Sequence, residues 1–159
     1  MKIYRHLASL AAFSNLDDDA WSALEQAMGV RDYADGECFF REGDPGDGLY
    51  LILDGNVTVT ASKSDRPSRL RAGDFFGLVA LLDGHPRSAT CCADGIVLAA
   101  HLPRSAFLDL YRAKTELAFA LQMLVAEQLV RDTRAYSRAL IDAAQRRESG
   151  GLEIFAGLP

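Results

Sequence analysis

Arg87 is the residue of this sequence best suited to bind an anion. It is the only lysine or arginine in the stretch Gly73–Thr90, which otherwise consists of apolar and turn-forming residues with one acid at each turn. Small residues at Gly77, Gly84 and Ala89 let backbone N–H groups come close to a bulky ligand. A turn with exposed N–H groups beside an arginine forms a concave receptor for a phosphate. The stretch therefore predicts a phosphate-binding turn.

The same stretch resembles the phosphate-binding cassette of cyclic-nucleotide-binding domains. That cassette reads Phe-Gly-Glu-x-Ala-Leu, followed after a short gap by Pro-Arg-x-Ala-Thr, and this chain has Phe76–Leu81 and Pro86–Thr90 in the corresponding places. The resemblance covers roughly residues 7–147, and this ordered set of motifs is specific to the fold. The upstream motifs that match the family in order and approximate spacing are Gly36-Glu37, Glu42-Gly43-Asp44, Gly46-Asp47, Leu49-Tyr50 and Gly55-x-Val57.

The resemblance implies a role for each residue of the site. Arg87 would pair with the exocyclic phosphate oxygens while Asp47 orients it, and backbone N–H groups would complete the phosphate site. Two alternatives stay open: Arg87 pairs with an acid such as Asp47 and binds nothing, and the Ser88 hydroxyl satisfies its own turn. We favour an anion-facing Arg87 because the small residues around it have no other evident purpose. The expected ligand-binding residues are Phe76, Gly77, Leu78, Val79, Arg87, Ser88 and Ala89.

Leu78 is the one departure from the family pattern that bears on the ligand. The family has a glutamate there that accepts a hydrogen bond from the ribose 2′-hydroxyl, and leucine cannot accept one. A buried hydroxyl without a partner costs about 1–3 kcal/mol, which is about ten- to a hundredfold in affinity. Asp74 and Asp83 carry carboxylates nearby, but nothing in the sequence directs them to the site. Either a weaker or different ligand binds, or the site is a relic.

Helices and short strands must position this cassette. Residues 7–28 are expected to be helical, with Asp17 as the N-cap and Trp21, Leu24 and Met28 on one apolar face. From Val30 onward the sequence predicts short strands between glycine turns. These include a hairpin across Asp54-Gly55, and two strands separated by Asp94-Gly95. With the resemblance, this implies an α+β fold: an antiparallel β-roll or jelly roll of about eight strands, with N-terminal helices and a long C-terminal helix.

After Pro103 the pattern becomes helical. A short helix is expected through Tyr111, and a longer one from about Thr115 to about Arg147, where Ser149-Gly150-Gly151 would end it. The predicted domain therefore spans residues 1–148, followed by a tail of residues 149–159. Residues 128–133 align with the stretch that would contact the nucleobase, although we prefer to treat them as ordinary exposed helix residues. An apolar stripe is either a packing face or the seam of a parallel homodimer; it comprises Leu117, Leu121, Val125 and Leu129.

Composition limits the partners. The 159 residues are 49% hydrophobic, which suits one globular domain, and the net charge of −5 argues against a nucleic-acid partner. Cys38, Cys91 and Cys92 have no metal-binding spacing, and the adjacent pair should point to opposite faces of a strand. The N-terminus has no signal-peptide pattern, and no stretch is apolar enough to span a bilayer. The sequence predicts a cytoplasmic protein with reduced thiols and no contact with DNA or membrane.

These residues are compatible with more than one function. The favoured one is a stand-alone sensor that binds cAMP or cGMP and relays the event to a protein partner through its C-terminal helix. The alternative is a ligand-free, dimeric interaction module, which Leu78 favours. A DNA-binding regulator of the catabolite-activator type would require a helix-turn-helix after residue 147, which is not expected here. An enzyme or metal site is not expected either, because His6, His85 and His101 are scattered and form no ligand or triad pattern.

Overall fold

The computed structural model describes residues 2–8, 10, 13–62, 66–78, 81, 84–113 and 115–155. The chain divides into two compact units, residues 1–121 and residues 122–159. The strands and the cassette belong to the first unit. Within the described ranges, no helix combines the length and the apolar content needed to cross a bilayer.

Two helices begin the first unit, α1 (Lys2–Leu7) and α2 (Asp18–Ala27). The predicted N-cap is confirmed, because the Asp17 carboxylate accepts a hydrogen bond from the N–H three residues later at 2.8 Å. Trp21 of α2 is buried, and its ring lies edge-on to that of Tyr4 in α1, with centroids 4.9 Å apart. The apolar face expected from the sequence therefore joins the two helices.

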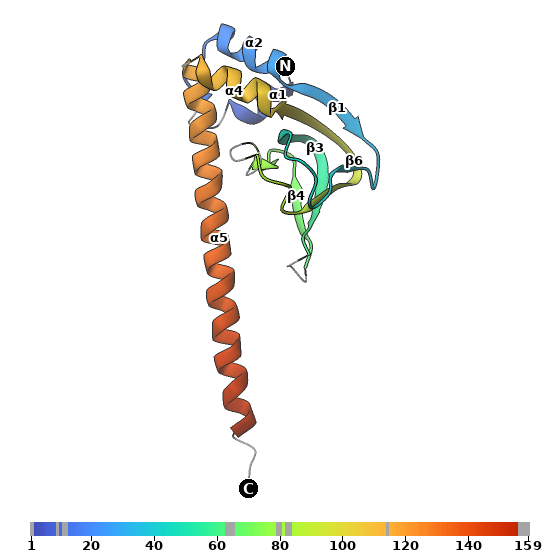
Figure 1. Ribbon diagram of the computed structural model, residues 1–159, viewed down its shortest axis with the longest axis vertical. Helices are drawn as coiled ribbons and strands as arrows, with labels where there is room; N and C mark the ends of the chain where they lie inside the picture. The colour runs from blue at the N-terminus through green and yellow to red at the C-terminus, as the bar shows by residue number, and fades with distance from the viewer. Residues whose placement is uncertain are drawn as a thin grey trace. The chain divides into compact units, whose positions relative to one another are not determined.

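The strands form one antiparallel sheet in which β3 and β6 are central (Figure 1). These two strands pair with each other along nearly their whole length. The shorter β1 and β2 pair with β6, while β4 and β5 pair with β3. The strand bounds are β1 Gly29–Tyr33, β2 Cys38–Phe40, β3 Gly48–Thr60, β4 Ser68–Arg71, β5 Phe75–Phe76 and β6 Thr90–Pro103.

The expected hairpin at Asp54-Gly55 is wrong, and so is the strand break at Asp94-Gly95. Each dipeptide lies inside one continuous strand, and the β3–β6 register shifts around Asp54. Positive φ values at Gly55 (89°) and Gly95 (82°) let each strand bend without ending. The first half of β6 thus pairs with β2 and its second half with β1. Likewise, the first half of β3 pairs with β5 and its second half with β4. The described residues form six strands, fewer than the eight implied by the resemblance, because two expected pairs are single strands.

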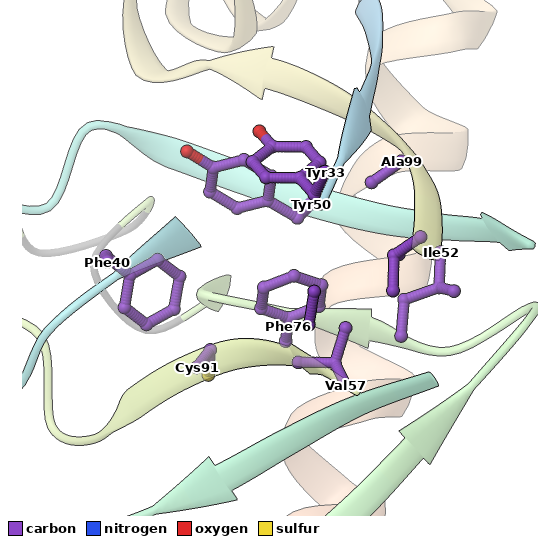
Figure 2. Close-up of a cluster of buried hydrophobic side chains, with 10 residues drawn as sticks. Tyr33, Phe40, Tyr50, Ile52, Val57, Phe76, Cys91 and Ala99 are labelled. Atoms are coloured by element: carbon purple, nitrogen blue, oxygen red, sulfur yellow. The ribbon is translucent and has the colours of Figure 1, made fainter. Parts of the chain in front are cut away.

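The interior of the roll combines aromatic rings with aliphatic side chains (Figure 2). The rings of Tyr50 and Phe76 stack with centroids 5.2 Å apart, and Phe40 lies 5.8 Å from each. Burying a large apolar side chain contributes about 1.5–3 kcal/mol, so these rings hold β2, β3 and β5 together. The buried cluster comprises Tyr33, Phe40, Tyr50, Ile52, Val57, Phe76, Cys91, Ala93, Val97 and Ala99.

Two helices follow the sheet, α4 (Arg104–Arg112) and α5 (Glu116–Phe155). Their starting points agree with the sequence analysis, with Pro103 as the N-cap residue of α4. The expected end of the long helix is wrong, because α5 continues through Ser149-Gly150-Gly151. Glycine lowers helix propensity by about 1 kcal/mol per residue but removes no backbone donor, so it does not by itself stop a helix. The domain boundary at residue 148 stays a prediction.

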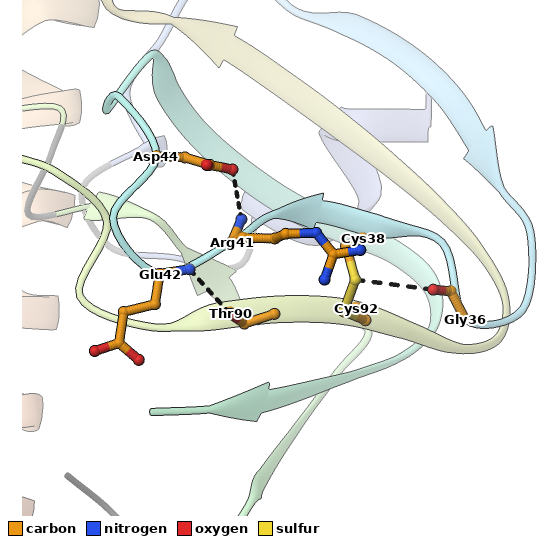
Figure 3. The surroundings of a disulfide bond; sticks show 7 residues. All are labelled: Gly36, Cys38, Arg41, Glu42, Asp44, Thr90 and Cys92. Atoms are coloured by element: carbon orange, nitrogen blue, oxygen red, sulfur yellow. Dashed lines mark hydrogen bonds between the residues drawn. A yellow bond between two sulfur atoms is a disulfide. The ribbon is translucent and has the colours of Figure 1, made fainter. Parts of the chain in front are cut away.

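A disulfide between Cys38 and Cys92 joins β2 to β6 (Figure 3). The two residues lie opposite each other in the strand register, 54 positions apart in sequence. The expectation of reduced thiols is therefore wrong, since sequence spacing does not show which cysteines a sheet places opposite one another. Cys91 and Cys92 do face opposite ways: Cys91 is buried as a free thiol, and burial raises its pKa to about 12.

Candidate ligand-binding site

Arg87 is the one buried polar or charged residue in the part of the chain that the structure describes, with 3% of its surface exposed. Its Nη2 donates to Asp47 Oδ1 at 2.5 Å and to the Gly48 carbonyl oxygen at 2.9 Å. Its Nη1 donates to the Gly77 carbonyl oxygen at 2.8 Å. The guanidinium carbon lies 4.0 Å from the centre of the Phe40 ring. Residues far apart in sequence thus surround one cation on several sides.

The Nε of Arg87 is buried and has no hydrogen-bond partner among the described residues. A buried donor without a partner costs about 1–3 kcal/mol, and an anion that reached it would offset that cost. The structure is therefore compatible with both interpretations of Arg87, as the ion-pair partner of Asp47 and as a residue that faces an anion. The pairing with Asp47 is present, and one donor of the same guanidinium is left without an acceptor.

The glycine- and acid-rich loop after β2 fastens the backbone of Arg87. The Gly43 N–H donates to the Arg87 carbonyl oxygen and the Arg87 N–H donates to the Asp44 carbonyl oxygen, both at 2.8 Å. Side chains hold this loop as well: Asp44 accepts from the Arg41 N–H, and Thr90 accepts from the Glu42 N–H (Figure 3). The loop therefore fixes the path of the chain through the arginine.

Gly77 has a conformational and a steric reason to be glycine. Its φ is 80°, in the left-handed region, and a Cβ at this position would run into Nη1 of Arg87. The residues on either side, Phe76 and Leu78, are buried at 6% and 5% exposure. Leu78 thus contributes a buried apolar side chain next to Gly77. Val79, also expected in the site, lies outside the described residues.

Ser88 and Ala89 directly follow Arg87 in the chain. Ser88 is exposed and Ala89 half-buried. Within the described ranges, no hydrogen bond uses the N–H of either residue or the Ser88 hydroxyl. That the two N–H groups donate to a bound phosphate stays a prediction.

The other acids and polar residues considered from sequence are engaged elsewhere. The Asp74 carboxylate accepts from the Arg71 N–H at 2.9 Å within its own turn, and Asp83 lies outside the described residues. In α5, the Gln128 side chain accepts from Arg131, and the Thr133 hydroxyl donates to a carbonyl oxygen of the same helix. The described residues contain no His, Cys, Asp and Glu cluster that could hold a metal ion.

His101 is a neighbour of the site that sequence reasoning missed. Its Nε2 lies 3.9 Å from Asp47 Oδ2, and its ring stacks on Tyr50 with centroids 4.4 Å apart. Burial lowers the pKa of His101; the Asp47 carboxylate raises it and the Arg87 charge lowers it further. Burial also raises the pKa of Tyr50, to about 12, with Asp47 adding to the effect. No motif marked His101, because the strand register alone places it opposite Tyr50.

Comparison with known proteins gives a consistent set of matches. The family described as the cyclic nucleotide-binding domain matches residues 30–114. The chain is 34% identical over 114 residues to a cAMP-dependent protein kinase regulatory subunit of Dictyostelium discoideum, covering 67% of this chain and 35% of that protein. It is 28% identical to a CRP-like cAMP-activated global transcriptional regulator of Mycobacterium tuberculosis, covering 93% of this chain and 75% of that protein. A solved cyclic nucleotide-binding domain from Methylobacillus flagellatus superposes with a TM-score of 0.75 at 26% identity, covering 87% of this chain and 81% of that one.

Proposed function

Because this chain belongs to the family of cyclic nucleotide-binding domains, we propose that it binds cAMP or cGMP and acts as a regulatory domain, not as an enzyme. Two of the similar proteins carry cAMP in their names, which favours that nucleotide. The chain spans about a third of the kinase regulatory subunit, so its activity within a whole protein is part of the proposal. A cytoplasmic location stays a prediction, and the Cys38–Cys92 disulfide is the observation that argues against it.

The observation that carries the proposal is the unpartnered Nε of the buried Arg87. A cyclic phosphodiester offers the negatively charged oxygen that this donor lacks. Asp47 holds the guanidinium through Nη2, and the N–H groups of Ser88 and Ala89 would add neutral donors. The residues proposed to contact or frame the nucleotide are Phe76, Gly77, Leu78, Val79, Arg87, Ser88 and Ala89, with Asp47 supporting Arg87.

We propose that Arg104 carries the binding event into the helices. It is the first residue of α4; its N–H donates to the Asp47 carbonyl oxygen at 2.8 Å, and its Nε donates to the Leu81 carbonyl oxygen at 3.1 Å. The start of α4 is thus bonded both to the acid beside Arg87 and to the cassette. A ligand that shifts either one would move α4, and through it the helix that follows, toward a protein partner.

We also propose that α5 forms a homodimer, on a different face from the one expected. Leu117 and Leu121 are buried, so they are not available to a second chain. Further along, Met123 and Val130 are seven residues apart and exposed, and with Ala126 they line a shallow groove. Apolar residues at this spacing suit helix-to-helix pairing. Charges of both signs flank the groove, which suits pairing with a second copy of itself; they are Glu127, Arg131 and Arg134.

The alternative is a ligand-free interaction module with the same fold. Buried Leu78 supports it, and so do the hydrogen bonds that the Arg87 guanidinium already donates to oxygen atoms of the protein. In this case the guanidinium is a structural cross-link between the cassette and β3, and the chain acts only through its helices.

A titration of the purified protein with cAMP and cGMP, by calorimetry and thermal shift, separates the two. A ligand that binds only the native state raises the melting temperature as its concentration exceeds Kd. We expect saturable binding that Arg87→Ala abolishes and that Arg66→Ala, an exposed arginine outside the site, retains. If wild type binds neither nucleotide, the interaction module becomes the better account.

A further inference from the structure

We propose that His101 is a positioning residue that takes over the Asp47 carboxylate when a nucleotide engages Arg87, so that binding takes up a proton. The inference rests on the proposed function, and it assigns to the same site a proton-linked step. The observation behind it is that the Asp47 carboxylate lies between two groups. It is bonded to the Arg87 guanidinium, and it lies near the His101 imidazole but beyond hydrogen-bond distance.

The Asp47 carboxylate has one oxygen for each neighbour. Oδ1 accepts from Arg87, whereas Oδ2 lies 3.9 Å from His101 Nε2, about 1 Å beyond hydrogen-bond distance. The Asp47 side chain is 59% exposed, while those of Arg87 and His101 are 1% and 27% exposed. Asp47 is thus the least enclosed of the three groups. A shift of about 1 Å in its carboxylate would close the bond to His101.

The imidazole is fixed in place. It stacks on Tyr50, and a Cβ added at Gly48 would lie 2.5 Å from His101 Nε2, so the absence of a side chain at Gly48 is what leaves room for this nitrogen. Nε2 is buried and has no hydrogen-bond partner among the described residues. Asp47 Oδ2 is the acceptor within reach if this nitrogen carries a proton.

The charges around His101 give the step its direction. The groups that act on it are Asp47, before β3, and Arg87, in the cassette; the third neighbour, Tyr50, stays neutral because its pKa is about 12. Without ligand, Arg87 opposes protonation of His101 and engages Asp47. A phosphodiester that binds Arg87 neutralises its charge and competes with Asp47 for its donors. Both changes favour the imidazolium, which takes its proton from the solvent and holds Asp47.

Linkage makes the effect reciprocal: a proton that ligand binding draws in also tightens the ligand. If binding raises the pKa of His101 by about one unit, about half a proton is taken up at a pH midway between the two values. Affinity then increases by up to about tenfold from neutral to mildly acid pH. The phosphodiester itself keeps one negative charge over this range and adds no protonation of its own.

The test is calorimetric titration with cAMP and cGMP at about pH 6.5, where an ordinary histidine is half protonated, in two buffers of different ionisation enthalpy. The difference in apparent enthalpy between the buffers gives the number of protons taken up. We expect fractional uptake in wild type and none in His101→Phe, which keeps an aromatic ring against Tyr50 but cannot be protonated. His6→Gln, which changes a histidine of α1, should retain the uptake.

Each outcome decides the inference. Nucleotide binding without proton uptake in wild type would overturn it and leave the proposed function intact. Proton uptake that persists in His101→Phe would show that another group takes up the proton. Loss of the uptake in His85→Gln would assign the proton to His85. Either result would also overturn the inference. Failure of wild type to bind either nucleotide would overturn both. Uptake lost only in His101→Phe, with binding retained, would establish it.

Discussion

Asp47 and Arg87, 40 residues apart in sequence, form an ion pair in which the guanidinium is buried and the carboxylate is more than half exposed. The pair therefore connects the interior of the roll to its surface. The cation is held by its backbone acceptors and by the Phe40 ring, and the anion is the more exposed partner. Because of this difference in exposure, Asp47 is the partner whose position a ligand or a substitution would change more readily.

Removing the carboxylate should destabilise the fold. Asp47→Ala leaves the Arg87 charge without its counter-ion, and we expect the free energy of unfolding to fall by about 1–3 kcal/mol, less than for a fully buried pair because Asp47 is exposed. Asp47→Asn keeps an acceptor for Nη2 and should lose less. Urea denaturation measures both, with Asp32→Ala, an exposed acid on β1, as the control. Unchanged stability of Asp47→Ala would show that the ion pair does not support the fold.

An acid at position 78 should improve nucleotide binding. Leu78→Glu supplies the acceptor that the resemblance implies for this position, and the gain expected is about ten- to a hundredfold in Kd. The same change should lower the melting temperature without ligand, because Leu78 is 5% exposed and a carboxylate is poorly accommodated there. Leu78→Met, apolar and similar in size, is the matched control. Equal affinity in the Glu and Met variants would show that this position does not contact the ligand.

Acid should weaken the ligand-free fold through His101. Because its pKa is lowered in the native state, the unfolded chain binds the proton more readily. The contribution of His101 to stability is therefore complete above the ordinary histidine pKa and is lost as pH falls from that value through the lowered pKa of the native state. Denaturation at neutral and mildly acid pH should show a smaller decrease in His101→Phe than in wild type. The same pH dependence in both proteins would count against a half-buried, neutral His101.

Reduction of the Cys38–Cys92 disulfide should destabilise the roll. The loop it closes spans 54 positions, and the chain-entropy relation gives up to about 4 kcal/mol for a loop of this length. Cys38→Ser and chemical reduction should lower the free energy of unfolding alike. Alkylation with mass spectrometry should find no reactive thiol in the native oxidised protein, since the free Cys91 is buried with its pKa raised to about 12. Rapid modification of Cys38 without reductant would refute the bridge.

The exposed face of α5 should control the oligomeric state. Val130→Glu puts a charge into the groove and should convert a dimer to monomer without unfolding the first unit, which sedimentation and circular dichroism would show. Glu127→Gln, at the edge of the same groove, should have a smaller effect. A wild-type protein that is monomeric at all accessible concentrations would exclude this interface.

Local signals in the sequence predicted the elements that depend on neighbouring residues. The Asp17 cap and the start of α5 each follow from side-chain chemistry within a few positions. The pairing of Asp47 with Arg87 was available only through the family resemblance, since 40 residues separate them. The same local signals failed at Asp54-Gly55 and Asp94-Gly95. A dipeptide suited to a hairpin is equally suited to a bend inside a strand, and pairing with a distant strand decides between them.

By itself, then, the sequence identified the candidate cassette, its cation and the starts of α2, α4 and α5, because these are properties of short segments, whereas α1 begins at Lys2, ahead of the expected residue 7. The tertiary structure decided what surrounds that cation. The pairing of β3 with β6 places His101 on Tyr50 and beside Asp47, and the pairing of β2 with β6 brings Cys38 to Cys92. Register between distant strands is set by the packing of the whole core, and no local spacing in the chain encodes it.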